Sequence, residues 1–177
     1  MAGPGRGASG NSDSEYFFGL FYRRTQHTQG PDATMSLHPD YPIITGSDQM
    51  TDEWTLLLPE KFNRRFEDGS LVVWRPELTF WITIWGNDRG QSADERLASI
   101  LETANDLRSE QQIDRSTGLV RLTYELPEKD ASRRKPVYTS ISGYVIGPTG
   151  HVQMSAYFDT PKARALGYEV IHSVQTP

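Results

Sequence analysis

The stretch Gly147-Pro148-Thr149-Gly150-His151-Val152-Gln153-Met154-Ser155-Ala156-Tyr157-Phe158-Asp159-Thr160-Pro161 decides the fold of this chain of 177 residues. Its Gly-Pro-Thr-Gly turn leads into residues 151–158, whose alternating pattern predicts a strand. Thr160 is a typical helix N-cap, and Pro161 suits the first helical position because its missing amide proton is not needed there. A final helix is predicted from apolar residues at helical spacing: Ala163, Leu166, Val170, Ile171 and Val174.

Two further strands are predicted before this turn, at residues 120–126 and 137–146. In residues 120–126, apolar side chains alternate with Arg121, Thr123 and Glu125, so this strand is expected to have one apolar face and to lie nearer an edge. A charged hairpin loop joins the two strands and contains the only dense basic run, Arg133-Arg134-Lys135. The more ordinary interpretation of that run is a solvated charge cluster.

A helix is predicted at about residues 93–108. Ser92 and Glu95 have the spacing of a capping box, in which each side chain satisfies a backbone N–H group of the other residue. The apolar residues that follow form one helical stripe: Leu97, Ile100, Leu101, Ala104 and Leu107.

Four strands are predicted before that helix. Residues 54–58 form a short apolar run ended by Pro59, and Asp68-Gly69 favours a tight hairpin turn between residues 62–67 and 70–75. Residues 78–85 carry the strongest alternation of the chain, and both faces are largely apolar. This strand is therefore expected to be central and covered on both sides.

The predicted order is four strands, a helix, three strands and a helix (ββββ-α-βββ-α). It indicates an α+β fold, with an antiparallel sheet of about six to seven strands and two helices packed on it.

The composition changes near residue 50. Residues 1–50 are expected to be a largely disordered leader, because small and polar residues bury too little surface to offset the entropy of ordering. Residues 51–177 are expected to form a single α+β domain. Five aromatic residues within 16–22 suggest a short motif that docks on a partner or on its own domain. The alternative is an overextended start, with Met35 or Met50 as the true first residue instead of Met1.

Composition excludes several classes of function. The net charge of -5 argues against a nucleic-acid partner, because phosphate binding needs a basic patch. The absence of cysteine excludes disulfides, thiol catalysis and thiolate metal sites, and it suits the cytoplasm, which is the expected location. We expect no export signal, and no apolar run approaches the roughly 18 residues of a membrane span.

The sequence resembles the fold shared by the photosystem extrinsic protein PsbP and the Ran-binding import factor Mog, and more closely small, mostly uncharacterised bacterial proteins of that fold. The likeness covers about residues 53–175. It is carried by Leu57-Leu58-Pro59, Trp74-Arg75-Pro76, Gly150-His151-Val152-Gln153-Met154, Ala156-Tyr157-Phe158-Asp159 and Ile171-His172-Ser173-Val174. The resemblance implies a scaffold, an assembly factor or an effector-binding chaperone, and generally not an enzyme. It supplies no catalytic residues.

No catalytic or metal-binding pattern is present in the sequence. The four histidines form neither a two-histidine helix pair nor a His-X-Glu cluster: His27, His38, His151 and His172. We therefore expect no metal, no cofactor and no catalytic residue. Whether the protein is an enzyme stays open, and a non-catalytic role is the favoured interpretation.

Two groups of residues are candidates for binding. Trp74, Trp81 and Trp85 fall close together, and the last two point the same way from one strand, so they would line an apolar groove. The more ordinary interpretation is core beneath a helix. The second group is Asn87, Asp88 and Arg89, with His151 as a further candidate. It lies near a helix N-terminus, which favours anions, although an ordinary strand-to-helix loop is the simpler interpretation.

Three hypotheses follow for the function. The leading one is a non-catalytic protein-binding module that uses an aromatic sheet face. The second is a small-ligand-binding protein or enzyme with a pocket near residues 87–89. The third is a toxin-immunity or secretion-linked protein whose acidic surface meets a basic partner. The sequence leaves the partner and the oligomeric state open.

Overall fold

The computed structural model describes residues 36–127 and 138–177. The aromatic segment at residues 16–22, the candidate starts Met1 and Met35, and the basic run in the loop at 128–137 lie outside the described residues.

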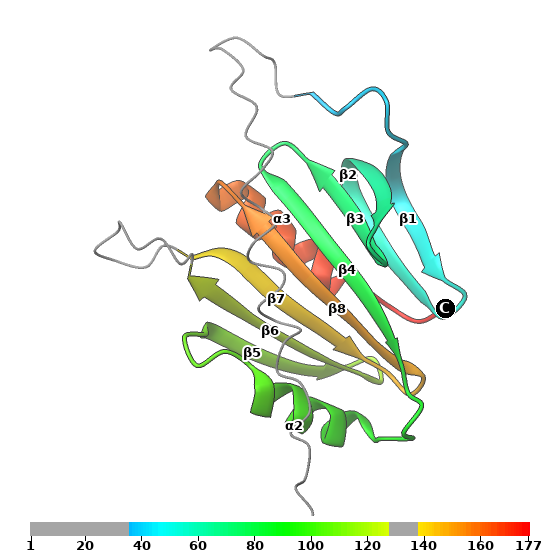
Figure 1. Ribbon diagram of the computed structural model, residues 1–177, viewed down its shortest axis with the longest axis vertical. Helices are drawn as coiled ribbons and strands as arrows, with labels where there is room; N and C mark the ends of the chain where they lie inside the picture. Colours follow the sequence, from blue (N-terminus) through cyan, green and yellow to red (C-terminus); the bar gives the residue numbers. More distant parts are fainter. Residues whose placement is uncertain (1–35, 128–137) are drawn as a thin grey trace, which may run out of the picture. The chain divides into compact units, whose positions relative to one another are not determined.

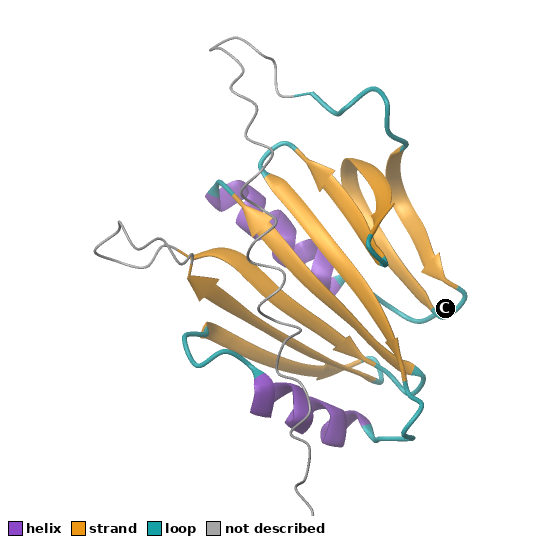
Figure 2. Ribbon diagram, in the orientation of Figure 1, coloured by secondary structure: helices purple, strands orange, loops and turns teal. Residues whose placement is uncertain are grey.

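Among the described residues, eight strands form one antiparallel sheet (Figures 1 and 2). One helix follows the fourth strand in the chain, and a second helix follows the eighth strand. The spatial order is β1-β2-β3-β4-β8-β7-β6-β5. The strands are β1 (Ile43–Thr51), β2 (Trp54–Glu67), β3 (Ser70–Arg75), β4 (Leu78–Gly86), β5 (Ser109–Ser116), β6 (Leu119–Pro127), β7 (Tyr138–Ile146) and β8 (Gly150–Phe158). The helices are α2 (Ala93–Thr103) and α3 (Pro161–His172). The α+β class and the antiparallel sheet are therefore as predicted.

The expected strand number and order need correction. The described sheet has eight strands, not six to seven, and its order is ββββ-α-ββββ-α. The unpredicted strands are β1 and β5, the two edges of the sheet. An edge strand has a neighbour on one side only, and most side chains of β5 are exposed, so neither strand carries the apolar alternation of a buried one. Residues 43–50, expected in the leader, are thus part of the sheet.

Strand β2 is one continuous strand where the sequence predicted two. Its pairing with β1 shifts register between Ile44, opposite Phe62, and Gly46, opposite Leu58. Pro59 lies in this irregular stretch, where a residue without an N–H group is tolerated because the ladder is already interrupted. Proline therefore marks a bulge in β2 and not its end.

The turn and cap predictions are largely confirmed. Asp68 and Gly69 have positive φ values of 48° and 79° and join β2 to β3, as a tight primed turn requires. The capping box of Ser92 and Glu95 is present at the start of α2. However, α2 ends at Thr103 and not at residue 108, because the Asn105 side chain accepts the N–H of Leu107 (2.8 Å) and turns the chain toward β5.

The two helices cover opposite faces of the sheet. Helix α3 packs on the face that carries the larger core cluster, with Phe80, Met154 and Val170 among its buried members. Helix α2 packs on the other face, over β6 and β7, with Leu97, Leu122 and Tyr144. In Figure 1, α3 lies behind β4 and β8.

Strand β4 is central, between β3 and β8, as predicted, but the described helices cover it on one face only. Its residues Phe80 and Ile82 are buried beneath α3, whereas Trp81 and Thr83 on the other face stay partly exposed and Trp85 is exposed. The sequence predicted cover on both faces of this strand, and among the described residues a helix covers one of them.

Strand β6 has one apolar face, formed by Val120, Leu122 and Tyr124, and lies next to the edge strand β5, as predicted, but its polar face is buried as well. It lies between β5 and β7, and Arg121, Thr123 and Glu125 are all buried on its α3 side. Polar groups of the C-terminal segment accommodate Arg121 and Glu125, whereas the hydroxyl of Thr123 has no hydrogen-bond partner among the described residues. Arg121 donates to the carbonyl oxygen of Val174 (2.9 Å), and Glu125 accepts from α3.

Candidate functional site

Three of the four tryptophans lie on the sheet face opposite α3. Trp81 and Trp85 alternate on β4 with the buried Phe80 and Ile82, and Trp74 projects from β3 on the same side. Trp54 instead is fully buried in the core on the α3 side. We call this surface of β3, β4 and β8 the tryptophan face; besides its three tryptophans it carries Ser70, Val72, Thr79, Thr83, His151, Gln153, Ser155 and Tyr157.

Trp85 is the most exposed tryptophan, with 46% of its surface accessible. Its indole Nε1–H donates a hydrogen bond to Oε1 of Gln153 (3.2 Å) on β8. Its ring stacks on His151, with centroids 6.2 Å apart and planes within 14°. The side chain is therefore held in one orientation although it faces solvent.

Trp74 stands at the other end of the tryptophan face. Its ring contacts Tyr41 edge-on, with centroids 5.0 Å apart, and the guanidinium of Arg65 lies 4.9 Å from its centroid. These neighbours make Trp74 part of a small aromatic and cationic cluster, and they leave Trp85 as the clearest aromatic anchor of the face.

A pocket opens where the tryptophan face meets α2. Its volume is about 290 Å³. We call it the Arg96 pocket, and its lining residues are Trp85, Gly86, Asp88, Arg89, Gln91, Arg96, Ser99, Ile100, Thr103 and His151. The end of β4, the loop after it, the start of β8 and one side of α2 thus contribute to a single cavity.

Among the described residues, Arg96 is the one buried charged residue in the lining of this pocket, and it is only 7% exposed. Its Nη1 donates to the carbonyl oxygen of Gly86 (3.0 Å) and to Nδ1 of His151 (2.9 Å). Its Nη2 donates to Oδ1 of Asn87 (2.6 Å). The side chain thereby ties α2 to the ends of β4 and β8.

The structure separates the roles of the three loop residues predicted as a site. Asn87 is a structural residue, because its side chain also bonds to the backbone of Gln91 and Pro148. Asp88 and Arg89 are exposed and line the pocket. The N-terminus of α2 is occupied by its own capping box, so the charge available to an anion comes from arginine and not from the helix end.

His151 belongs both to the pocket wall and to the tryptophan face. Burial and, second, the nearby charge of Arg96 lower the pKa of His151 to about 4. Its ring is therefore neutral at neutral pH. Since arginine can only donate, Nδ1 is the acceptor and the ring proton is on Nε2.

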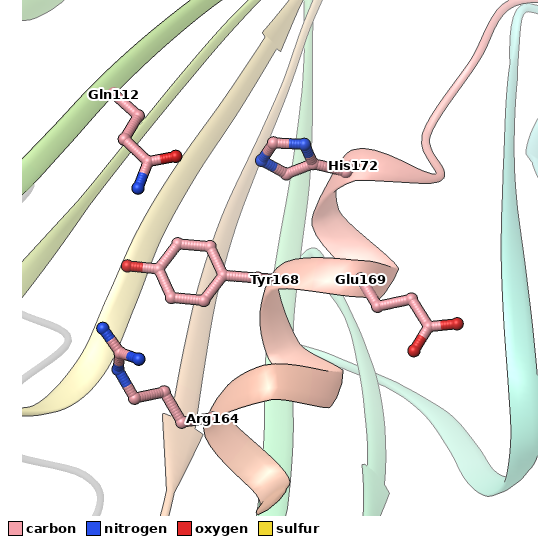
Figure 3. A pocket seen from close by; sticks show the side chains of 5 residues that line it. All are labelled: Gln112, Arg164, Tyr168, Glu169 and His172. Atoms are coloured by element: carbon pink, nitrogen blue, oxygen red, sulfur yellow. The ribbon is translucent and has the colours of Figure 1, made fainter. Parts of the chain in front are cut away.

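A second pocket, of about 380 Å³, lies between α3 and β5 (Figure 3). Arg164, Tyr168 and His172 follow one another at four-residue spacing along α3, and Figure 3 shows Gln112 of β5 reaching toward them. Glu169 also lines the pocket but points away from this group in the view. These residues form the α3 pocket.

The buried carboxylate of Glu125 anchors the α3 pocket. It accepts hydrogen bonds from Nε of Arg164 (2.5 Å) and from the hydroxyl of Tyr168 (2.9 Å). The bond to Glu125 raises the pKa of Arg164, and burial, with help from the same carboxylate, raises the pKa of Tyr168. Because these groups satisfy one another, we interpret the α3 pocket as structural.

Sequence reasoning missed Arg96, which is not part of the apolar stripe of its helix. The signal was weak, because a single arginine in an amphipathic helix is usually exposed. It also missed the polar row of Glu125, Arg164 and Tyr168. There, the i, i+4 spacing of the two α3 residues was visible, but their buried partner on β6 was not.

Within residues 36–127 and 138–177, no group of three or more His, Cys, Asp or Glu side chains is placed to hold a metal ion. No helix in the same residues is long and apolar enough to cross a membrane. No protein-family model matches this chain, and no curated protein is similar to it.

Proposed function

We propose that this protein is a non-catalytic binding module, an adaptor, chaperone or assembly factor, that holds an extended segment of another protein on its tryptophan face. The observation that carries the proposal is Trp85, which is exposed to solvent yet fixed by Gln153 and by stacking on His151. A single exposed hydrophobic residue is ordinary on a protein surface, but three tryptophans gathered on one sheet face are typical of an interaction surface.

A pre-oriented tryptophan is well suited to bind a partner. Tryptophan is enriched among the residues that contribute most to protein–protein binding, because it buries a large area with few rotatable bonds. The hydrogen bond to Gln153 removes part of the remaining freedom before the partner arrives, so less entropy is lost on binding. On the same face, Thr79 and Ser155 offer hydroxyl groups to the backbone of a bound segment, whereas the Thr83 hydroxyl is bonded to that of Ser70 (3.2 Å).

The resemblance to the PsbP/Mog-like fold remains part of this proposal. A single antiparallel sheet with a long final helix supports it, and relatives of that fold act as scaffolds, assembly factors or chaperones.

The proposal is tested by affinity capture with the full chain as bait, in lysate of the native host and with mass-spectrometric quantification. Three baits are compared: wild type, Trp85→Ala and Phe66→Ala. Phe66 is the matched control, because it is an exposed aromatic residue, 71% accessible, on the opposite face of the sheet.

The proposal expects one stoichiometric partner that binds wild type and Phe66→Ala equally. Binding of that partner to Trp85→Ala should weaken by about 2 kcal/mol, roughly thirty-fold, the usual effect of removing a central tryptophan. A partner that binds all three baits equally, or no partner at all, contradicts the proposal. The thermal transition of each bait shows that the variants are folded.

A second candidate function is small-ligand binding in the Arg96 pocket. It is favoured by the convergence of Arg96, His151 and Trp85 on one cavity of about 290 Å³, near the lower end of the usual size of ligand pockets. A thermal-shift screen of small carboxylic and aromatic compounds checks it. Hits that stabilise wild type and not Trp85→Ala support this alternative.

A further inference from the structure

Arg96 is a buried cation whose partners are all neutral. Its three hydrogen bonds go to the backbone oxygen of Gly86, to the amide oxygen of Asn87 and to the ring nitrogen of His151. Among the described residues, no carboxylate lies within ion-pair distance of its guanidinium, although other arginines have such partners. A buried charge without a counter-ion is unfavourable, so the site favours an incoming anion.

Arg96 also has donors to spare. A guanidinium carries five N–H groups, of which the three hydrogen bonds use three. The Nε–H is among the two that remain. Because Arg96 lines the pocket, a ligand in the pocket reaches this side chain.

We propose that the Arg96 pocket binds a carboxylate group carried by the protein segment that lies on the tryptophan face, an inference that rests on the proposed function. The occupant follows from continuity, since Trp85 and His151 belong both to the pocket wall and to the tryptophan face. A segment that packs on Trp85 therefore places its next polar group beside Arg96.

A carboxylate fits this pocket better than a phosphate. The planar pair of carboxylate oxygens matches the edge of a guanidinium, and a single negative charge balances the single buried cation. Arg89 adds a second cation at the exposed rim, but Asp88 beside it opposes a more highly charged group.

The test uses the full chain, labelled with nitrogen-15, and two peptide probes. The first is acetyl-Gly-Ser-Phe with a free C-terminal carboxylate, and the second is the same peptide amidated. Both offer an aromatic ring to Trp85, and only the first offers a carboxylate to Arg96. The readouts are the NMR signals of the Arg96 Nε–H and the Trp85 Nε1–H.

The proposal expects the acid to shift both signals and to bind at least about ten-fold more tightly than the amide, as a charge-assisted hydrogen bond implies. Arg96→Gln, which keeps much of the side-chain length without the charge, should abolish that preference. If Arg96→Gln does not fold, the proposal is still tested by comparing the two peptides on the wild-type protein and on Arg89→Gln. Arg89→Gln should leave most of the preference intact.

Equal affinity for the two peptides, or shifts that exclude Arg96, would overturn the proposal. 3-Phenylpropionate serves as a third probe. If it binds as tightly as the peptide acid, the assignment to a protein segment is overturned in favour of a small carboxylate. The capture experiment distinguishes this inference from the proposed function. If Trp85→Ala loses the partner but the acid and the amide bind equally, the proposed function is supported and the carboxylate inference is contradicted.

Discussion

Arg96 of α2 donates a hydrogen bond through Nη1 to Nδ1 of His151 on β8 across 2.9 Å, although the two residues are 55 positions apart in the chain. The pair closes one end of the sheet, because Arg96 also holds the last residue of β4. It places a buried cation and a neutral imidazole beside the exposed ring of Trp85. Arg96, His151 and Trp85 thus both form the proposed binding surface and hold one another in position.

The stability of the protein should fall as the pH is lowered from about 6.5 to about 4, in part because of His151. In this window the unfolded chain protonates this histidine, whose ordinary pKa is 6.5, whereas the folded chain keeps it neutral because its pKa is about 4. The stability that depends on a neutral His151 ring is fully present above pH 6.5. Since the ring is partly solvated, we expect a loss of about 1–2 kcal/mol.

The measurement is the free energy of unfolding in urea at pH 7 and at pH 5. His151→Gln keeps an acceptor for Arg96 and removes the titrating group, so its stability should change less between the two pH values. The other charged pocket residues, Arg96, Arg89 and Asp88, are common to both proteins. Equal pH dependence in wild type and His151→Gln would exclude this role.

Glu125→Ala should destabilise the protein by about 2 kcal/mol. The substitution removes a buried carboxylate that accepts from Arg164 and Tyr168, and it leaves the tyrosine hydroxyl without that acceptor. Urea denaturation measures the change. Arg115→Ala is the control, because its ion pair with Asp94 is exposed and is expected to contribute less than about 1 kcal/mol. Similar losses in both variants would mean that burial adds nothing to the Glu125 network.

Gly143→Ala should cost about 1–3 kcal/mol, because the core has no space for a methyl group at this position. A Cβ atom there would lie 2.7 Å from Cγ2 of Ile171, so α3 would have to move away from β7. Ser142→Ala, on the partly exposed opposite face, is expected to change stability by less than about 0.5 kcal/mol. A double-mutant cycle with Ile171→Ala should show favourable coupling, and strict additivity would refute the steric explanation.

A chain that starts at Met50 should be less stable than the full chain and prone to associate. It would lack most of β1, which leaves the edge of β2 unpaired. It would also lose the ion pair of Asp48 with Arg64 and the bonds that Asn63 makes to the backbone at His38 and Tyr41.

Thermal unfolding and gel filtration of the full chain and the Met50 chain check this expectation. Asn63→Ala in the full chain is the finer probe. Its side chain is fully buried and makes three hydrogen bonds to the segment before β1, so its loss should speed hydrogen exchange in residues 38–44. Unchanged stability after truncation would mean that β1 is dispensable.

Local signals in the sequence determined the parts of the fold whose cause lies within a few residues. Asp68-Gly69 predicts its hairpin because both residues accept positive φ values. Ser92 with Glu95 predicts the start of α2, and Thr160 with Pro161 that of α3, because these side chains satisfy or avoid the free N–H groups of a helix end. The apolar stripe of α3 likewise predicts its buried face, including Val170 and Ile171.

Only the tertiary structure decided the features whose cause is a neighbour far away in the chain. Pro59 lies inside a strand because β2 bulges there in its pairing with β1, and Glu125 is buried because Arg164 and Tyr168 compensate its charge. The candidate site is of the same kind. Trp85 could be assigned to a face from its alternation, but its exposure depends on where α2 packs, and Arg96 becomes a buried cation only when β4 and β8 meet it. Burial and charge compensation are properties of the packed neighbours, and a local pattern does not contain them.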